Sequence, residues 1–239
     1  MTAAPAYTRP REDHPEILDD RAVDSAIVSR SMHDVARSNA LFGGRRAVLR
    51  EIETALAPRG QSMTLLDVGT GLGDIPAAAR GVAERRGVRL FIIGLDLASA
   101  LARESRRNVD AAVVADAGAL PFRDRRVDIV TCSQLLHHFA PAQADVVVRE
   151  MDRVASRSVI VSDIRRSVFA VAGLWLASFI LRFHPVSRHD GVASIRRGFT
   201  TSGLSTLIGR AVGNTPCVRR HAGFRVTASW TPATSGSRP

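Results

Sequence analysis

Residues 65–75 of the chain read LLDVGTGLGDI, and this stretch decides the fold. An apolar run ends at Asp67, glycines follow at positions 69, 71 and 73, and a helix-compatible segment begins directly after them. A buried strand that stops in a glycine-rich turn and leads into a helix is typical of a site for a nucleotide-like ligand. Its backbone N–H groups approach the ligand closely, at the positive end of the helix. The turn therefore predicts such a site.

The spacing of the glycines separates the kinds of nucleotide ligand. A dinucleotide-binding turn has the pattern G-x-G-x-x-G, whose third glycine would fall at position 74, where this chain has Asp74. A phosphate-binding P-loop needs a lysine after its last glycine, and the chain contains no lysine. We therefore expect a ligand without a pyrophosphate, and a nucleotide-dependent oxidoreductase is the less favoured alternative.

Apolar runs alternate with amphipathic segments after the glycine turn. The expected strands cover residues 64–68, 90–96, 111–116, 127–133 and 158–163. The expected helices cover residues 74–86, 98–107, 141–155, 167–182 and about a dozen residues after Thr200. Two extended stretches, 215–221 and 224–230, are joined too closely for a crossover, so they predict an antiparallel hairpin. The fold class is α/β, a Rossmann-like sheet of seven mostly parallel strands with helices on both faces.

The sheet domain is expected to span residues 58–230, between a mobile arm at 1–15 with a helical cap at 16–57 and a disordered tail at 231–239. Residues 167–199 are expected to form an insertion with an apolar helix. Its fifteen uncharged residues, SVFAVAGLWLASFIL, are too few to span a bilayer comfortably. This helix therefore predicts a cover over the site, a homodimer interface or peripheral contact with a membrane.

Composition excludes several kinds of chemistry. The formal net charge of +10 is carried by arginine and is spread along the chain, so we expect no nucleic-acid partner. Without lysine the chain cannot form a Schiff base with a substrate. Its two cysteines, Cys132 and Cys217, are far apart and fit no zinc spacing, and we expect no metal. The N-terminus lacks an apolar signal region, which predicts a cytoplasmic protein.

Polar residues end each of the expected strands. Asp67 ends the first strand, Asp96 the second and Asp116 the third, while Ser133 and Asp163 end the next two. Ligands bind at the carboxyl ends of strands in an open parallel sheet. A carboxylate at Asp96 can accept both hydroxyls of a ribose, and one at Asp116 can accept the amine of adenine. A single aspartate at a strand end is often only a helix cap, but three in succession favour a site.

The ordered motifs LLDVGTGLGD, GLD, VVADAGALPF and VDIVTCSQLLHHF resemble those of class I S-adenosylmethionine-dependent methyltransferases. The ALPF and LHH segments are similar to the ubiquinone/menaquinone-type and small-molecule subgroup. The flanking segments PEILDD and RHDGVASIRRGFT resemble methyltransferases found beside bacterial polyketide genes. The resemblance implies S-adenosyl-L-methionine as the cofactor. The residues implied to bind it are Asp67, Gly69, Thr70, Gly71, Gly73, Asp96, Leu97, Asp116, Ala117 and Ser133.

The resemblance implies transfer of a methyl group to a small aromatic or polyketide-derived acceptor, with a lipophilic one among the possibilities and a role in secondary metabolism. We expect O-methylation of a hydroxyl, for which a nearby histidine is a suitable base. His137 and His138 follow the fourth strand, and His189 lies beside Asp190 in an expected loop before the last helix, so these histidines are the catalytic candidates. The alternatives are C-methylation of a lipid quinone precursor and a non-catalytic cofactor-binding subunit.

Overall fold

The computed structural model describes residues 16–20 and 22–233. The expected arm and residues 234–239 of the expected tail lie outside these described residues. One sheet contains seven strands in the order β3-β2-β1-β4-β5-β7-β6. The strands are β1 (Ser62–Val68), β2 (Arg89–Asp96), β3 (Ala111–Val114), β4 (Val127–Ser133), β5 (Ala155–Ile164), β6 (Cys217–His221) and β7 (Arg225–Trp230).

Strands β1 to β5 are parallel, and β7 runs antiparallel to both β5 and β6. The sequence prediction of a mostly parallel seven-stranded sheet with an antiparallel C-terminal strand is confirmed. Strand β3 is shorter than expected and ends at Val114, whereas β5 begins earlier than expected, at Ala155. The order of β1, β2 and β4 places the change in winding direction beside the glycine turn, where open α/β sheets bind ligands.

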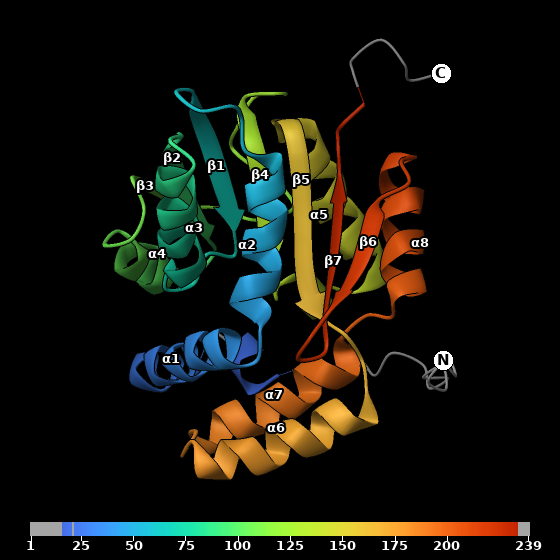
Figure 1. Ribbon diagram of the computed structural model, residues 1–239. Coiled ribbons are helices and arrows are strands. Elements are labelled where there is room, and N and C mark those ends of the chain that lie inside the picture. Colours follow the sequence, from blue (N-terminus) through green and yellow to red (C-terminus); the bar gives the residue numbers. More distant parts are fainter. Residues whose placement is uncertain (1–15, 21, 234–239) are drawn as a thin grey trace.

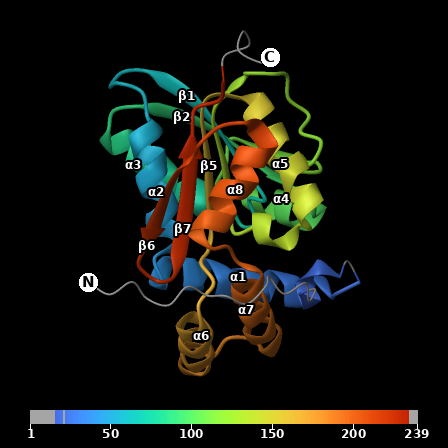
Figure 2. The ribbon, with the colours of Figure 1, turned by 90° about the vertical axis from the view of Figure 1, so that its right-hand side faces the viewer.

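Helices cover both faces of the sheet, as Figures 1 and 2 show. Alternate residues of the strands build the two cores: Leu66 and Val130 pack toward α5 and α8, while Leu65 and Ile129 pack toward α2 and α3. The helices are α1 (Ser25–Leu41), α2 (Gly44–Ala55), α3 (Asp74–Arg85), α4 (Ser99–Ser105), α5 (Pro141–Val154), α6 (Val168–Ile180), α7 (Pro185–Arg197) and α8 (Thr201–Val212). Two 3-10 turns, η1 (Ile17–Asp19) and η2 (Leu136–His138), complete the described elements.

Three helices lie beyond the carboxyl ends of the parallel strands. Figure 1 shows α1, α6 and α7 grouped below the arrowheads of β1 and β5, away from the rest of the sheet. Helix α7 contacts both α6 and α1. Helix α1 of the predicted cap and helices α6 and α7 of the predicted insertion therefore lie together beyond the edge of the sheet where a ligand is expected. Helix α2, also within the predicted cap, packs against the sheet.

One expected element is wrong: His189 and Asp190 lie within helix α7, and not in a loop. Pro185 occupies the first turn of this helix, and His184 Nδ1 accepts a hydrogen bond from the Val186 amide. Gly191 weakens the helical pattern in the sequence, but it allows α6 to approach closely. A Cβ atom at position 191 would lie 2.7 Å from Leu174 Cδ2.

Candidate active site

The glycine turn after β1 has a backbone that only glycine adopts without strain. The φ angles of Gly69, Gly71 and Gly73 are 72°, 54° and 73°, all in the left-handed region. The Gly69 and Thr70 amides donate to the Leu95 carbonyl at 2.8 and 3.0 Å. These hydrogen bonds hold the turn against the end of β2, and α3 begins directly after it.

The carboxylate of Asp96 fixes the turn from the neighbouring strand. Its Oδ2 atom accepts the Gly71 amide at 3.0 Å, and its Oδ1 atom accepts the Ala98 amide at 2.9 Å. Burial raises the pKa of Asp96, although these amide hydrogen bonds oppose that shift. Asp116 lies one strand further out, is exposed, and accepts the Gly118 amide at 2.7 Å.

Asp67 lies beneath the turn and is almost completely buried. Its Oδ1 atom accepts a hydrogen bond from Thr131 Oγ1 at 2.8 Å. Burial raises the pKa of Asp67 to about 7, because water no longer stabilises the charged form. A fraction of the Asp67 carboxyl groups is therefore protonated at neutral pH.

A cavity of about 880 Å³ opens at this end of the sheet and extends from the glycine turn to α1, α6 and α7. Most of the site residues that the sequence predicts line it: Asp67, Gly69, Thr70, Gly71, Asp96, Leu97, Asp116, Ala117, Ser133, His137 and His138. Two predicted residues lie elsewhere. Gly73 caps the N-terminus of α3, and His189 lies on the outside of α7 in a separate hollow of about 360 Å³.

A buried ion-pair cluster forms one wall of the cavity. The His137 ring donates from Nδ1 to Asp163 Oδ1 at 2.7 Å, and its Nε2 atom lies 3.5 Å from Glu16 Oε1. Burial alone would lower the pKa of His137, but the carboxylates of Asp163 and Glu16 raise it to about 9. His137 therefore carries a proton at neutral pH and is unsuited to remove one from a substrate.

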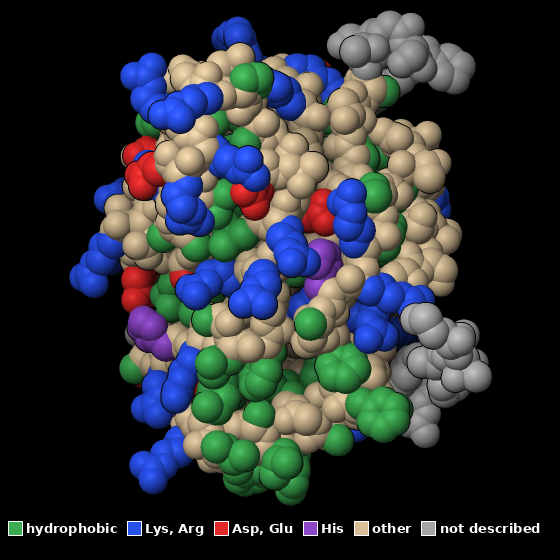
Figure 3. All heavy atoms as spheres, viewed as in Figure 1, with side chains coloured by type: hydrophobic (Ala, Val, Ile, Leu, Met, Phe, Trp, Pro, Cys, Tyr) green, Lys and Arg blue, Asp and Glu red, His purple; other side chains and the backbone are tan. Residues whose placement is uncertain are grey.

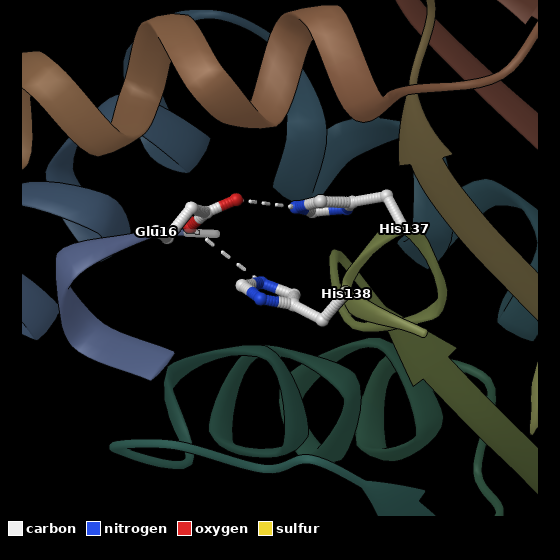
Figure 4. A group of neighbouring side chains, drawn as sticks. All are labelled: Glu16, His137 and His138. Atoms are coloured by element: carbon white, nitrogen blue, oxygen red, sulfur yellow. Dashed lines mark ion pairs between the residues drawn. The ribbon is translucent and has the colours of Figure 1, made fainter. Parts of the chain in front are cut away.

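His138 faces the same cavity but is partly exposed and differently held. Its Nδ1 atom lies 2.7 Å from Asp19 Oδ1. Its Nε2 atom lies 3.8 Å from Glu16 Oε2, a pair drawn in Figure 4. Arg197 donates to Asp19 Oδ2 at 2.7 Å, and hydrogen bonds from both His138 and Arg197 keep the pKa of Asp19 well below its usual range. Because Asp19 is ionised, its contact with Nδ1 orients the His138 ring in the cavity wall.

The cluster ties the first described residues to α7. Asp190 accepts the amides of Ile17 and Leu18 at 2.9 and 3.0 Å, and Ser194 donates to Glu16 Oε1 at 2.8 Å. Residues 16–19 are thus held across the cavity by side chains more than 170 positions later in the chain. We call residues 16–19 the N-terminal strap.

Sequence reasoning missed the two carboxylates that the strap contributes, Glu16 and Asp19. The segment PEILDD contains both of them, but no local pattern links them to histidines at positions 137 and 138. Gln134 was missed as well. It has a φ of 52°, lines the cavity, and donates a side-chain hydrogen bond to Asn39 of α1. Residues other than glycine with φ in the left-handed region are uncommon and cluster at functional sites.

Comparison with known proteins agrees with this geometry. Residues 66–161 match the sequence model of the family described as "Methyltransferase domain". Residues 66–161 are a methyltransferase domain, and its cofactor is S-adenosylmethionine. No curated protein matches the chain.

Solved structures share the fold of this methyltransferase domain. A SAM-dependent methyltransferase from Aquifex aeolicus has 15% sequence identity and a TM-score of 0.60, and the match covers 86% of this chain and 98% of that one. Magnesium protoporphyrin IX methyltransferase from Synechocystis, with bound SAH, has 15% identity and a TM-score of 0.53, with 90% of each chain covered. The CMeT domain of citrinin polyketide synthase has 13% identity and a TM-score of 0.55, with 76% of this chain and 51% of that one covered.

The residues around the glycine turn fit S-adenosylmethionine. The Oγ atom of Ser133 is buried beside the cavity and has no hydrogen-bond partner among the described residues. A Cβ atom at Gly71 would meet no atom within 4 Å, so its absence leaves open space at the cavity wall. An unpaired hydroxyl and a bare backbone are suited to a polar ligand that approaches closely.

We expect the affinity for S-adenosylmethionine to rise about tenfold between about pH 6 and about pH 8. The cofactor carries a positive sulfonium, which favours the ionised form of Asp67, and in the free protein this carboxyl has a raised pKa of about 7. Below about pH 7, protonation of Asp67 therefore competes with binding of the cofactor. Above that pH the carboxyl is already ionised, and there is no such competition. Calorimetric titration at several pH values measures the effect. Asp67→Asn is expected to remove the pH dependence, and a flat profile for the unmodified chain would contradict the assignment.

Removal of divalent metal ions is expected to leave methyl transfer unchanged. Ligand atoms of Glu16, His137 and His138 lie within 4.8 Å of one another, a spacing that would suit a metal ion. The protonated His137 ring, however, already supplies the positive charge that Glu16 faces. Activity measured before and after dialysis against EDTA checks this. A loss of activity that added zinc restores would show that a metal occupies the cluster.

Proposed function

We propose that this methyltransferase methylates a hydroxyl group of a small aromatic or polyketide-derived acceptor, with His138 as the base. The observation that carries the proposal is the Asp19–His138 pair in the cavity wall, with Nδ1 held at 2.7 Å. An imidazole that a carboxylate orients at Nδ1 is suited to take the proton from a phenol at Nε2 as the oxygen is methylated.

The chain's own residues position the reactants and exclude water. S-adenosylmethionine, when bound, supplies an activated methyl group that needs no further activation. Asp96, Ser133 and the glycine turn are the residues that we propose hold it, since they line one half of the cavity. The strap and α7 close the opposite side. Close positioning of a nucleophile against the methyl carbon accounts for much of the rate in such a displacement.

The other half of the cavity is apolar, which supports an acceptor with little charge. This surface comes from α1, α6, the end of α7 and the segments that follow α1 and precede α7, with side chains from Val28, Met32, Val35, Phe42, Leu174, Phe183 and Ile195. Apolar walls with a few placed polar groups are usual for small-molecule sites. We propose that residues 16–57 and 167–199 select the acceptor. A domain of a polyketide synthase shares this fold, and together with the apolar surface this supports a polyketide-derived phenol as the acceptor.

C-methylation of a lipid quinone precursor is the second candidate, because α6 carries apolar side chains on its outer surface as well. A phenol that has lost its proton is nucleophilic at the neighbouring ring carbons, so the same base serves both reactions. O-methylation and C-methylation are distinguished by the bond that forms when the methyl group leaves the sulfonium. In the first a carbon–oxygen bond forms, and in the second a carbon–carbon bond forms with loss of the ring proton.

The test is incubation of the purified protein with S-adenosylmethionine labelled with carbon-13 in its methyl group, and with a panel of phenols and hydroxyquinones. We expect a methoxy signal in the product by nuclear magnetic resonance. A label found only on ring carbon would overturn the first candidate in favour of the second. Binding of S-adenosylmethionine without transfer to any acceptor would indicate a non-catalytic subunit.

A further inference from the structure

The outer face of helix α6 exposes large apolar side chains. Six of the twelve exposed large apolar side chains among the described residues lie on this one helix, with exposed fractions between 47% and 78%. They are Val168, Phe169, Trp175, Leu176, Phe179 and Ile180, which we call the α6 face. At 100° per residue they form a single stripe roughly 140° wide. Figure 3 shows apolar side chains gathered at this lower end of the molecule.

The opposite side of α6 is part of the cavity wall. Ala170, Gly173 and Leu174 line the cavity, and Leu174 packs against Gly191 of α7. Helix α6 is therefore a wall with apolar side chains on both sides. A soluble monomer rarely leaves a contiguous apolar stripe of this kind uncovered, and such a stripe marks a site of association.

Positive charge borders the α6 face, and negative charge is absent from the segment. Residues 164–189 contain four arginines and no aspartate or glutamate. Arg182 is exposed just after the end of the helix. The Arg188 guanidinium lies 4.2 Å from the centroid of the Phe179 ring. An apolar stripe with arginines at its edges matches the chemistry of an anionic lipid surface, where the side chains enter below the headgroups and the arginines meet phosphates.

A second copy of the chain fits the α6 face less well. A two-fold contact between two α6 helices would bring the arginines of both copies together. The helix has 13 residues and is about 20 Å long at 1.5 Å per residue. A stripe of that length and about 10 Å width falls well short of the about 800 Å² per partner that a stable interface buries.

We propose that the α6 face docks on an anionic bilayer surface. No helix among residues 16–20 and 22–233 is long and apolar enough to cross a membrane, so contact is at the interface. Docking places the outer side of the cavity wall in the lipid. For substrate class the inference rests on the proposed function: the acceptor would carry an apolar tail and reach the cavity from the bilayer. The docking itself is tested without turnover.

Tryptophan fluorescence provides a direct test. Trp175 lies on the α6 face with 56% exposure, whereas Trp230, the chain's other tryptophan, is buried and donates to Asp152. We expect emission to shift to shorter wavelength when vesicles of phosphatidylglycerol and phosphatidylcholine are added, and brominated lipid to quench it. Phosphatidylcholine vesicles alone are expected to bind more weakly, and added salt to weaken binding to the anionic ones. Trp175→Phe removes the signal, while flotation with the vesicles still recovers the protein.

Surface variants distinguish docking through the α6 face from non-specific adsorption to vesicles. Phe169→Ser combined with Ile180→Ser is expected to lower vesicle binding at least about tenfold. Neither side chain lines the cavity, so affinity for S-adenosylmethionine and transfer to a short, water-soluble phenol are expected to stay the same. Phe91→Ser, at an exposed aromatic on β2, is the matched control and is expected to bind vesicles normally. Thermal unfolding monitored by circular dichroism verifies that each variant is folded.

Two results would overturn the docking proposal. One is the absence of vesicle binding by the unmodified chain. The other is a dimer in light scattering that the double variant converts to a monomer, since the α6 face would then be covered by a second copy. If vesicles bind but no phenol is methylated, docking stands and the proposed function fails.

Discussion

Replacement of His138 by glutamine is expected to lower kcat by a factor of about 10² to 10⁴. Glutamine preserves the size of the side chain but cannot take a proton from the acceptor. His138 stands in the cavity wall with Nδ1 held by Asp19, so its loss removes the oriented base and leaves the glycine turn intact. Steady-state kinetics give the change in kcat. Calorimetry is expected to show unchanged affinity for S-adenosylmethionine.

Two further variants sharpen this result. Asp19→Asn is expected to cause a smaller loss of kcat, because it weakens the contact that orients the His138 ring but leaves the ring in place. His189→Gln is the matched control and is expected to have no effect, since the His189 ring lies outside the cavity with a side-chain exposure of 59%. Equal losses of kcat and of cofactor affinity in His138→Gln would mean that the ring has a structural role.

Asp163→Ala is expected to lower the free energy of unfolding by about 3 to 5 kcal/mol, as is usual when one member of a buried ion pair is removed. Asp163 is fully buried at the end of β5. It accepts hydrogen bonds from His137 Nδ1 at 2.7 Å, from the His137 amide at 3.1 Å and from the Ile164 amide at 2.7 Å. Without the carboxylate these donors lose their partner, and the protonated His137 ring loses the nearer of the two carboxylates that face it, at 2.7 Å against 3.5 Å for Glu16.

Urea denaturation with and without the substitution measures this loss. Asp163→Asn preserves the volume and a carbonyl acceptor, so a smaller destabilisation is expected. Asp124→Ala removes a carboxylate that is 72% exposed and pairs with Arg153, and it is expected to cost less than about 1 kcal/mol. Similar effects of the two alanine substitutions would show that burial does not strengthen the Asp163–His137 pair.

The sheet was predictable because its signals are local. Strands β1, β4 and β5 are largely buried on both faces and read as short apolar runs, and the turn at 69–73 needs glycine wherever φ is positive. Helix α7 was missed for an equally physical reason. Gly191 lowers helix propensity, and its benefit lies in the close approach of Leu174 from another helix, which no local pattern records.

The two halves of the candidate site differ in the same way. The residues proposed to bind the cofactor follow strand ends at regular intervals, so sequence spacing could predict that they line one cavity. The acceptor half is assembled from contacts such as that between the Ile17 amide and Asp190, 173 positions apart. The protonation state of His137 could not be predicted from its residue type. Two carboxylates that lie beside it only in the folded chain raise its pKa to about 9.

The N-terminal strap both covers the cavity and supplies the carboxylates that pair with its two histidines. Glu16 is a counter-ion of His137, and Asp19 is the partner of His138, while both belong to the one segment that lies across the cavity. If that segment lifts to admit an acceptor, each histidine loses a carboxylate in the same movement. The open form is therefore also the form in which Asp19 no longer orients the His138 ring. Proton removal and exclusion of solvent then begin together, when the strap returns.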